Sequence, residues 1–506
     1  MSRNNSDVTA SVSDSQRRMA AVKVAGYDNL NESNRTLKNP VCNGKKENSV
    51  NGKVHHSQNG HVKPKLVSNG VHGYAPLYNP FEQFYSRYVY RRVRHIFNRP
   101  ICSTPGAEVT LKERATDDYN WSFRFTGTEK RCINLGSYNY LGFASPSGEC
   151  ADAAEAAARR YGLALASPRA ELGSTPIHKE LEETTAKFLG VEDAVVFGMG
   201  FATNALGIPG LLGAGTLVLS DENNHASLIL GLRLARVRVR VFPHNDLPQL
   251  ERLARAAIAE GRWQRIVVVV EGVYSMEGSV VPLAALVALK KRYGLLLYLD
   301  EAHSVGAMGA RGRGVPDHCG VAPADVDVLM GTFTKSFGAA GGYIAGSARL
   351  VAGVRARGHA HAYAHAMAPA VCAQVLAAMR ALAAPAGGAR VRALRDNTRH
   401  FRRRLRAMGV LVFGHEDSPV VPMLVYTFSK MAATVERLTA RGVATVGVGF
   451  PATPLSKARI RFCLSAAHSR DQLDRCLDAI EQVADELGLR YARRAAPAAP
   501  PTDTPH

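Results

Sequence analysis

Residues 295–346 read LLLYLDEAHSVGAMGARGRGVPDHCGVAPADVDVLMGTFTKSFGAAGGYIAG and contain apolar runs at 295–300, 326–332 and 342–346. Four similar runs precede them, at 194–197, 216–220, 239–242 and 266–272. Helix-like stretches such as 283–293 separate most of these runs. Short apolar strands that alternate with helices are typical of a mainly parallel sheet covered on both faces. The sequence therefore predicts an α/β fold with a large domain over 131–385.

The rest of the 506-residue chain divides around this predicted sheet. Residues 1–75 are rich in Asn, Gly, Ser and Lys and are expected to form a disordered leader. Residues 76–130 are expected to hold an N-terminal helix and an arm. A smaller α+β domain is predicted over 386–492, beginning with an Arg-rich helix, and a flexible tail over 493–506. Within residues 81–97, aromatic and basic residues recur at helical spacing, which suits either a membrane interface or packing on the protein itself.

Composition narrows the class of protein. Apolar residues make up 46% of the chain and charged residues 21%, as in globular proteins. The net charge is +20, and residues 1–100 contain 16 Lys and Arg against 6 Asp and Glu. Because about half of this excess lies in the first 100 residues, where no nucleic-acid-binding motif is found, we expect no nucleic-acid role. The eight cysteines form no CxxC pair, and we expect reduced thiols and no metal site. No apolar run is long enough for a transmembrane helix, and no secretory signal is found.

Polar residues with catalytic potential follow the predicted strands, where ligands bind in such sheets. Asp300 ends one apolar run, and Lys335 follows the next one, 35 residues later. A buried aspartate needs a cation, which a protonated ring nitrogen supplies, and a buried lysine can form a Schiff base. Taken alone, an aspartate here is more often a helix cap. The pair in this order predicts a pyridoxal phosphate site.

Two further segments fit this prediction. The turn GMGFATN (198–204) precedes a predicted helix, and backbone amides at a helix N-terminus bind phosphate. His225 follows the run at 216–220 and could stack on a planar ring, although taken alone such a residue is more often structural.

Several longer segments match a known family: SDENNHASLILG (220–231), VEGVYSMEGS (270–279), DEAHSVGAMGARGRG (300–314), GTFTKSFGAAGG (331–342), GFPATP (449–454) and RFCLSAAH (461–468). From about residue 76 to 490 the chain resembles the α-oxoamine synthases, a family of fold-type I pyridoxal phosphate enzymes. Within that family it is most similar to the catalytic long-chain-base subunits, types 2 and 3, of serine palmitoyltransferase. Two segments depart from the family pattern: Tyr161–Gly173, and Tyr363–Ala366, where the family has a threonine.

The resemblance implies a role for each matching residue. Lys335 would bond to the cofactor and remove the substrate's Cα proton, Asp300 would pair with the ring nitrogen, and His303 would contact the ring hydroxyl. His225 would stack on the ring and, with Lys335 and Asp300, make up the catalytic set. The remaining predicted residues are the phosphate-region set Gly200, Phe201, Thr332 and Thr334, and the substrate set Arg461, Asn139 and Tyr140.

The resemblance also implies a reaction and partners. The chain would condense L-serine with a long-chain acyl-CoA such as palmitoyl-CoA, with loss of CO2, to give 3-ketosphinganine. Its partner would be the lysine-less subunit 1, with small regulatory membrane subunits possible, at the cytosolic face of the endoplasmic reticulum. Two alternatives remain: another α-oxoamine synthase using glycine or alanine with a shorter acyl-CoA, and a non-catalytic scaffold subunit. The Arg399–Arg406 run either attracts CoA phosphates or is a solvated helix face.

Overall fold

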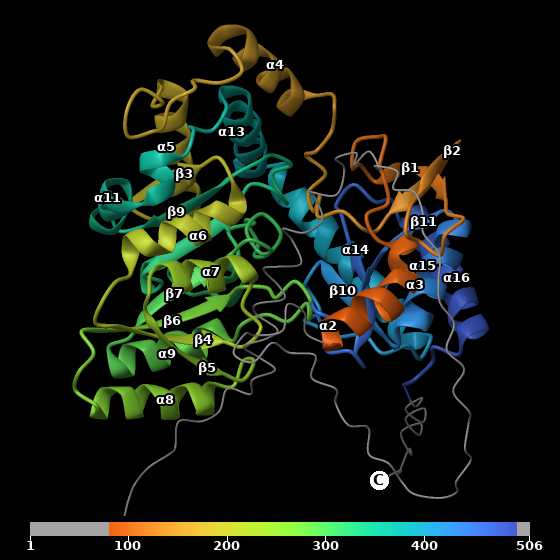
Figure 1. The fold of residues 1–506 in the computed structure, drawn as a ribbon. Coiled ribbons are helices and arrows are strands. Elements are labelled where there is room, and N and C mark those ends of the chain that lie inside the picture. The colour runs from red at the N-terminus through yellow and green to blue at the C-terminus, as the bar shows by residue number, and fades with distance from the viewer. Residues whose placement is uncertain (1–79, 493–506) are drawn as a thin grey trace, which may run out of the picture.

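A large mixed sheet forms the centre of the computed structural model, which describes residues 80–492 (Figure 1). The predicted leader (1–75) and tail (493–506) lie outside the described residues. In spatial order the strands are β3 (Asp193–Phe197), β9 (Gly342–Gly346), β8 (Val328–Thr332), β7 (Leu296–Asp300), β6 (Arg265–Glu271), β4 (Thr216–Asp221) and β5 (Arg238–Phe242). Within this sheet β9 pairs antiparallel with β3 and β8, and all the other neighbouring strands are parallel. The predicted mainly parallel α/β sheet is confirmed.

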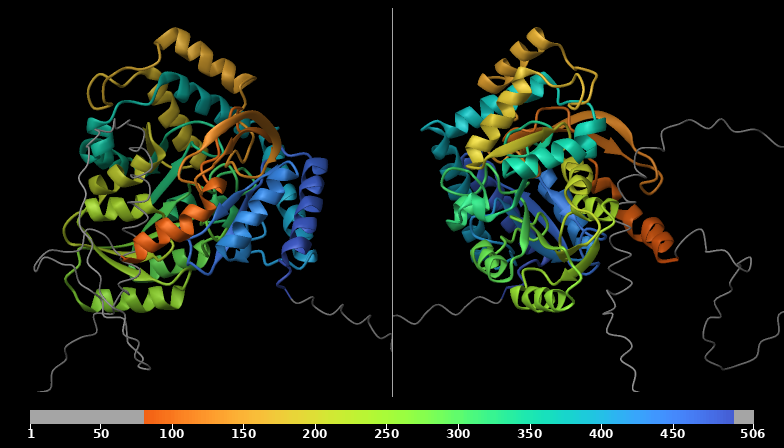
Figure 2. Two further views of the ribbon diagram at one scale, coloured as in Figure 1. Left: turned by 45° about the vertical axis from the view of Figure 1, so that its right-hand side comes forward. Right: turned by 90° about the vertical axis from the view of Figure 1, so that its left-hand side faces the viewer.

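The sheet is buried on both faces. Alternate residues of each strand point in opposite directions, so each strand contributes side chains to both apolar clusters. On β6, Val267 and Val269 belong to one apolar cluster, whereas Val268 and Val270 belong to the other. Helices cover both faces, as Figures 1 and 2 show. They are α5 (Pro176–Leu189), α6 (Gly200–Leu211), α7 (Ala226–Leu234), α8 (Leu247–Ala259), α9 (Leu283–Tyr293), α11 (Ala348–Arg357), α12 (His359–Tyr363) and α13 (Pro369–Ala383).

The C-terminal part packs beside this sheet (Figure 1). Its elements are α14 (Gly387–Ala407), β10 (Val420–Tyr426), α15 (Phe428–Ala440), β11 (Val443–Ala444), β12 (Val446–Val448), β13 (Ala458–Cys463) and α16 (Arg470–Leu487). The N-terminal arm joins it: β1 (Glu108–Ala115) pairs with β2 (Arg124–Asn134), and β2 pairs with β11. These arm strands and α15 were not predicted from the sequence. The predicted domain boundaries stay a prediction.

The aromatic segment near residue 80 is helical throughout. It comprises α2 (Pro80–Phe84), a π-helix (Tyr85–Tyr90), α3 (Arg91–Val93) and a 3-10 turn (Arg94–Ile96). One face packs on the protein itself: Val93 and Ile96 are buried, and the Tyr85 hydroxyl donates to the Phe450 carbonyl. Phe84 and Tyr88 are exposed. The structure therefore shows packing on the protein for one face of this helix.

Within residues 80–492, no single helix combines the length and the apolar composition needed to cross a bilayer. Only α13 and α14 meet these criteria together, as a pair bent by 85°.

The Arg-rich run of α14 is occupied by structural contacts. Arg402 is fully buried and donates to the carbonyls of Phe413, Ser418 and Val420. Arg399 pairs with Asp417 at 2.6 Å, and Arg406 pairs with Glu416. These three arginines therefore hold the loop after α14, and a role of the run in attracting CoA phosphates stays a prediction.

Candidate active site

The predicted site residues follow the carboxyl ends of adjacent parallel strands. Asp300 ends β7, Glu271 ends β6, and the two face each other in the strand register. Thr332 ends β8, and Lys335 follows it in the next turn. His225 follows β4 as the N-cap of α7. The doubly covered sheet thus gathers these residues at one edge, as such sheets do for ligand sites.

Asp300 is 3% exposed and held by two donors. The Asn204 amide donates to its Oδ2 at 2.7 Å, and the Ala302 backbone N–H donates to its Oδ1 at 2.9 Å. A buried carboxylate is costly unless it is hydrogen-bonded and meets a cation. The carboxylate is therefore oriented and suited to bind a protonated ring nitrogen.

Asn204 connects Asp300 to the rest of the site. Its carbonyl accepts from the Tyr298 hydroxyl at 2.7 Å, and its amide also donates to Ser227 Oγ at 3.0 Å. Ser227 Oγ lies 2.8 Å from His225 Nδ1. Tyr298 and Ser227 were not predicted, and Asn204 was expected only as part of the phosphate turn at 198–204, because each looks like an ordinary helix or strand residue until the fold brings them together.

Lys335 lies beside both Thr332 and Asp300. Its Nζ donates to Thr332 Oγ1 at 3.4 Å. Burial lowers the pKa of the Lys335 ammonium, while the charges of Asp300 and Glu271 oppose this and Arg461 adds to it. A lysine with a lowered pKa is a better nucleophile and base, because more of it is unprotonated at neutral pH.

His303 is buried at 6% exposure, next to Tyr140. The Tyr140 hydroxyl lies 2.8 Å from His303 Nδ1. Burial, together with the nearby charges of Lys335 and Arg461, holds the pKa of His303 well below its usual value. The ring is therefore neutral near pH 7. Tyr140, predicted to contact substrate, is fully buried and positions His303 through this hydrogen bond; its contact with substrate stays a prediction.

Tyr138 was missed by the sequence analysis, although it lies in the same SYNYLGF segment as Asn139 and Tyr140. Its ring centroid is 5.8 Å from Lys335 Nζ, 4.8 Å from Arg461 Cζ and 4.9 Å from the His303 ring. Arg461 lies on β13, 7% exposed, and so reaches this pocket from the C-terminal part.

The Asn139 side chain makes two hydrogen bonds to backbone groups. Its amide donates to the Pro105 carbonyl at 2.9 Å, and its side-chain carbonyl accepts from the Ala144 N–H at 3.2 Å. These bonds indicate a structural role, and its contact with substrate stays a prediction.

The start of α6 forms a cradle with the Lys335 turn. A Cβ on Gly200 would lie 3.1 Å from Thr332 Cγ2, 3.3 Å from the Gly341 carbonyl and 3.4 Å from Thr334 Cγ2. Phe201 is 40% exposed, and its ring packs edge-on against His225 at 6.0 Å. A helix N-terminus beside two threonine residues suits a phosphate. With Asp300 and Lys335 nearby, the residues present fit pyridoxal phosphate.

The two segments that depart from the family pattern lie side by side. Pro168 and His365 form an antiparallel bridge, and the Ala366 N–H donates to the Ser167 carbonyl at 3.1 Å. Arg169 in the same loop makes a double hydrogen bond to Glu182, at 2.9 and 3.1 Å. The departures therefore affect one local structure rather than two.

Comparisons with known proteins agree with this site. The pattern of the class I and II aminotransferase family matches residues 130–480. Human serine palmitoyltransferase 3 is 49% identical over 438 residues, which cover 84% of this chain and 79% of that protein. Serine palmitoyltransferase 2 of Schizosaccharomyces pombe is 44% identical over 434 residues, covering 84% and 72%.

Solved structures give the same result. The Sphingomonas wittichii serine palmitoyltransferase superposes with a TM-score of 0.70 at 27% identity, covering 81% of this chain and 99% of that one. A structure described as SPT with a PLP internal aldimine also has a TM-score of 0.70, at 26% identity, covering 81% and 100%. The predicted recognition, fold class and cofactor are confirmed. The chain belongs to the class I and II aminotransferase family of pyridoxal phosphate enzymes and, within it, to the serine palmitoyltransferases.

Proposed function

We propose that this chain condenses L-serine with a long-chain acyl-CoA, with loss of CO2, to make the 3-keto long-chain base 3-ketosphinganine. The observation that carries this proposal is the meeting of Lys335, Asp300 and Arg461 in one pocket of a chain 49% identical to a serine palmitoyltransferase. The presence of Lys335 and Asp300 argues against a non-catalytic scaffold.

The cofactor would supply an electron sink, which accepts the electron pair left when serine loses its Cα proton or when the β-keto acid formed by condensation loses CO2. Lys335 holds the cofactor and accepts and returns the Cα proton, for which its lowered pKa suits it. Asp300, oriented by Asn204, keeps the ring nitrogen protonated. His303 is neutral, so with Tyr140 donating to Nδ1 it can donate from Nε2 to the ring oxygen.

Arg461 binds the serine carboxylate in this proposal, because a guanidinium matches a carboxylate with two parallel hydrogen bonds. Binding would also neutralise a charge that lowers the pKa of Lys335. His225 covers the ring, and the α6 N-terminus with Thr332 and Thr334 holds the phosphate.

We further propose that the chain works with a lysine-less subunit 1 and small regulatory membrane subunits at the cytosolic face of the endoplasmic reticulum. The similarity to serine palmitoyltransferases 2 and 3 supports this assignment. Acyl-CoA and the product are both amphiphilic, which favours a site at a membrane surface.

The test is co-expression with a lysine-less subunit, followed by assay of membranes with labelled serine and palmitoyl-CoA. We expect a 3-keto long-chain base from the native chain and none from Lys335→Ala, which also loses the visible absorption of the bound cofactor. Labelled glycine and alanine serve as the parallel substrates. Faster turnover of glycine or alanine with a shorter acyl-CoA would favour the alternative synthase and contradict the proposal.

A further inference from the structure

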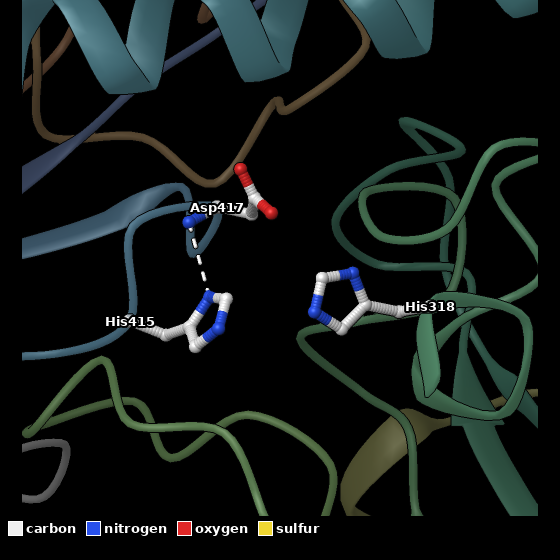
Figure 3. Close-up of side chains that lie close together, drawn as sticks. All are labelled: His318, His415 and Asp417. Atoms are coloured by element: carbon white, nitrogen blue, oxygen red, sulfur yellow. Dashed lines mark hydrogen bonds between the residues drawn. The ribbon is translucent and has the colours of Figure 1, made fainter. Parts of the chain in front are cut away.

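Two histidines and an aspartate meet where α10 (Val315–Cys319) faces the loop before β10. The ligand atoms of His318, His415 and Asp417 all lie within 4.8 Å of one another. The two imidazole rings are perpendicular, with centroids 5.2 Å apart. Figure 3 shows both rings and the carboxylate turned toward one shared gap. No metal site was expected from the sequence, because the cysteines form no CxxC pair; in the chain, His318 lies far from His415 and Asp417.

The loop before β10, which carries His415 and Asp417, is fixed by hydrogen bonds to its backbone. Buried Arg402 donates to three of its carbonyls, at Phe413, Ser418 and Val420. Gly414 packs so closely on Gly278 that a Cβ there would lie 2.5 Å from the Gly278 carbonyl oxygen. The His415 N–H donates to that same carbonyl at 2.9 Å. His415 and Asp417 are therefore presented in a fixed geometry.

The segment that carries His318 is also fixed. Neighbouring Asp317 accepts from the Arg311 N–H, Nε and Nη2, at 2.8, 3.0 and 2.8 Å. The His318 backbone N–H donates to the Gly314 carbonyl at 3.1 Å. Among residues 80–492, the His318 side chain makes no hydrogen bond, so its ring nitrogens are available to a ligand. Preorganised donors of this kind are what a binding site needs.

We propose that His318, His415 and Asp417 form a divalent transition-metal site, most suited to Zn²⁺, that joins the sheet-bearing part of the chain to the C-terminal part. Two imidazoles and one carboxylate are a common protein ligand set for zinc, with the remaining position left to water. Tetrahedral zinc ligands lie roughly 3.3 Å apart at bond lengths of about 2.0 to 2.1 Å. The ligand atoms, now within 4.8 Å of one another, therefore need to approach by about 1.5 Å at most.

Two existing contacts shape this site. Arg399 donates to Asp417 Oδ1 at 2.6 Å, which leaves the other carboxylate oxygen for a metal. The Asp417 N–H donates to His415 Nδ1 at 3.1 Å, and metal binding shifts the His415 proton to Nδ1 and breaks this bond. The positive charge of Arg399 weakens cation binding. This favours zinc, which bonds imidazole strongly, over magnesium or calcium, which prefer oxygen ligands.

The experiment uses full-length, cofactor-loaded protein stripped of metal with a chelator and titrated with Zn²⁺ against a chromophoric chelator. We expect the native chain to bind one more zinc per chain than His415→Ala or Asp417→Asn. The control, His55→Ala/His56→Ala, removes two histidines that do not belong to the cluster and should keep that zinc. Equal uptake by the native chain and His415→Ala would overturn the proposal.

A second measurement tests the bridging geometry. Co²⁺ at three protein ligands gives visible ligand-field absorption, which we expect in the native chain and not in His318→Ala. Because metal bound only to the folded state stabilises it, zinc should raise the melting temperature of the native chain and not of His415→Ala. Equal shifts in both proteins would refute a site that joins the two parts. His415 is exposed, so its removal leaves the metal-free fold intact.

Discussion

Replacing Asn204 by alanine tests whether the buried network behind Asp300 stabilises the fold. Asn204 is 1% exposed, receives the Tyr298 hydroxyl and donates to Asp300, both at 2.7 Å. The substitution leaves the Tyr298 hydroxyl buried without its acceptor, at a cost of about 1–3 kcal/mol. It also removes one donor from a buried carboxylate, at a cost of about 1.5–3 kcal/mol. We therefore expect a total loss of about 3–5 kcal/mol.

The assay is urea unfolding of the cofactor-free protein, followed by fluorescence. With a slope of about 3 kcal/mol per molar urea, the expected loss moves the midpoint by roughly 1 M or more. Tyr298→Phe removes only the hydroxyl and should cost about 1 kcal/mol. Because the two residues share one hydrogen bond, the double substitution should cost less than the sum of the single ones.

The matched control is Thr185→Val in α5. The Thr185 hydroxyl is also buried and donates to the Leu181 carbonyl at 2.7 Å, remote from the cofactor site. Since that carbonyl keeps its helical partner, the cost should be about 1 kcal/mol or less. A midpoint for Asn204→Ala within error of the Thr185→Val value would refute the reasoning.

Three further predictions follow from the same structure. Arg461→Lys keeps the charge but loses the paired geometry, so we expect a higher KM for serine with the visible cofactor band retained; an unchanged KM contradicts the carboxylate role. Burial raises the pKa of Glu301 to about 8 from its ordinary 4.5, so the folded protein keeps a proton that the unfolded chain releases. The contribution of Glu301 to the free energy of unfolding is therefore fully present below pH 4.5 and is lost as the pH rises toward 8. In unfolding measurements across this pH range, the free energy of unfolding of Glu301→Gln should decline less than that of the native chain. Gly314→Ala places a Cβ 1.6 Å from Glu301 Oε2 at a backbone φ of +89°, and it should lower the free energy of unfolding by about 3 kcal/mol or more. The control, Gly261→Ala, has a φ of +64° with open space around it and should cost about 1 kcal/mol in the same urea assay.

The sheet was predictable because its strands carry a strong local signal. All seven predicted runs are strands in the structure, and the helix predicted at 283–293 is α9, with the same bounds. Strands β1 and β2 were missed because most of β2 is exposed and polar, as in EKR at 129–131, so no apolar run marks it. Their position depends on pairing with β11, which is only two residues long and distant in the chain.

Some residues of the candidate site were also predictable from the sequence, and others were not. Asp300 and Lys335 were predictable because an aspartate and then a lysine follow two successive apolar runs, an order that suits a pyridoxal phosphate site although each residue alone is a weak signal. Asn204 and Tyr138 were not, because an asparagine inside a helix and a tyrosine in a loop carry no such mark. For Asn139 and Tyr140 the resemblance implied substrate contact, which stays a prediction, while the structure shows hydrogen bonds of Asn139 to Pro105 and Ala144 and of Tyr140 to His303.

The pocket must hold two cationic side chains, Lys335 and Arg461, whose mutual repulsion would otherwise work against folding. Tyr138 lies within cation–π distance of both. Because the face of an aromatic ring attracts cations, this ring offsets part of the repulsion without adding a negative charge. A carboxylate in its place would raise the pKa of Lys335 and compete with the substrate carboxylate for Arg461. An aromatic residue therefore allows Arg461 to stay charged for substrate binding while Lys335 keeps the lowered pKa that a base requires.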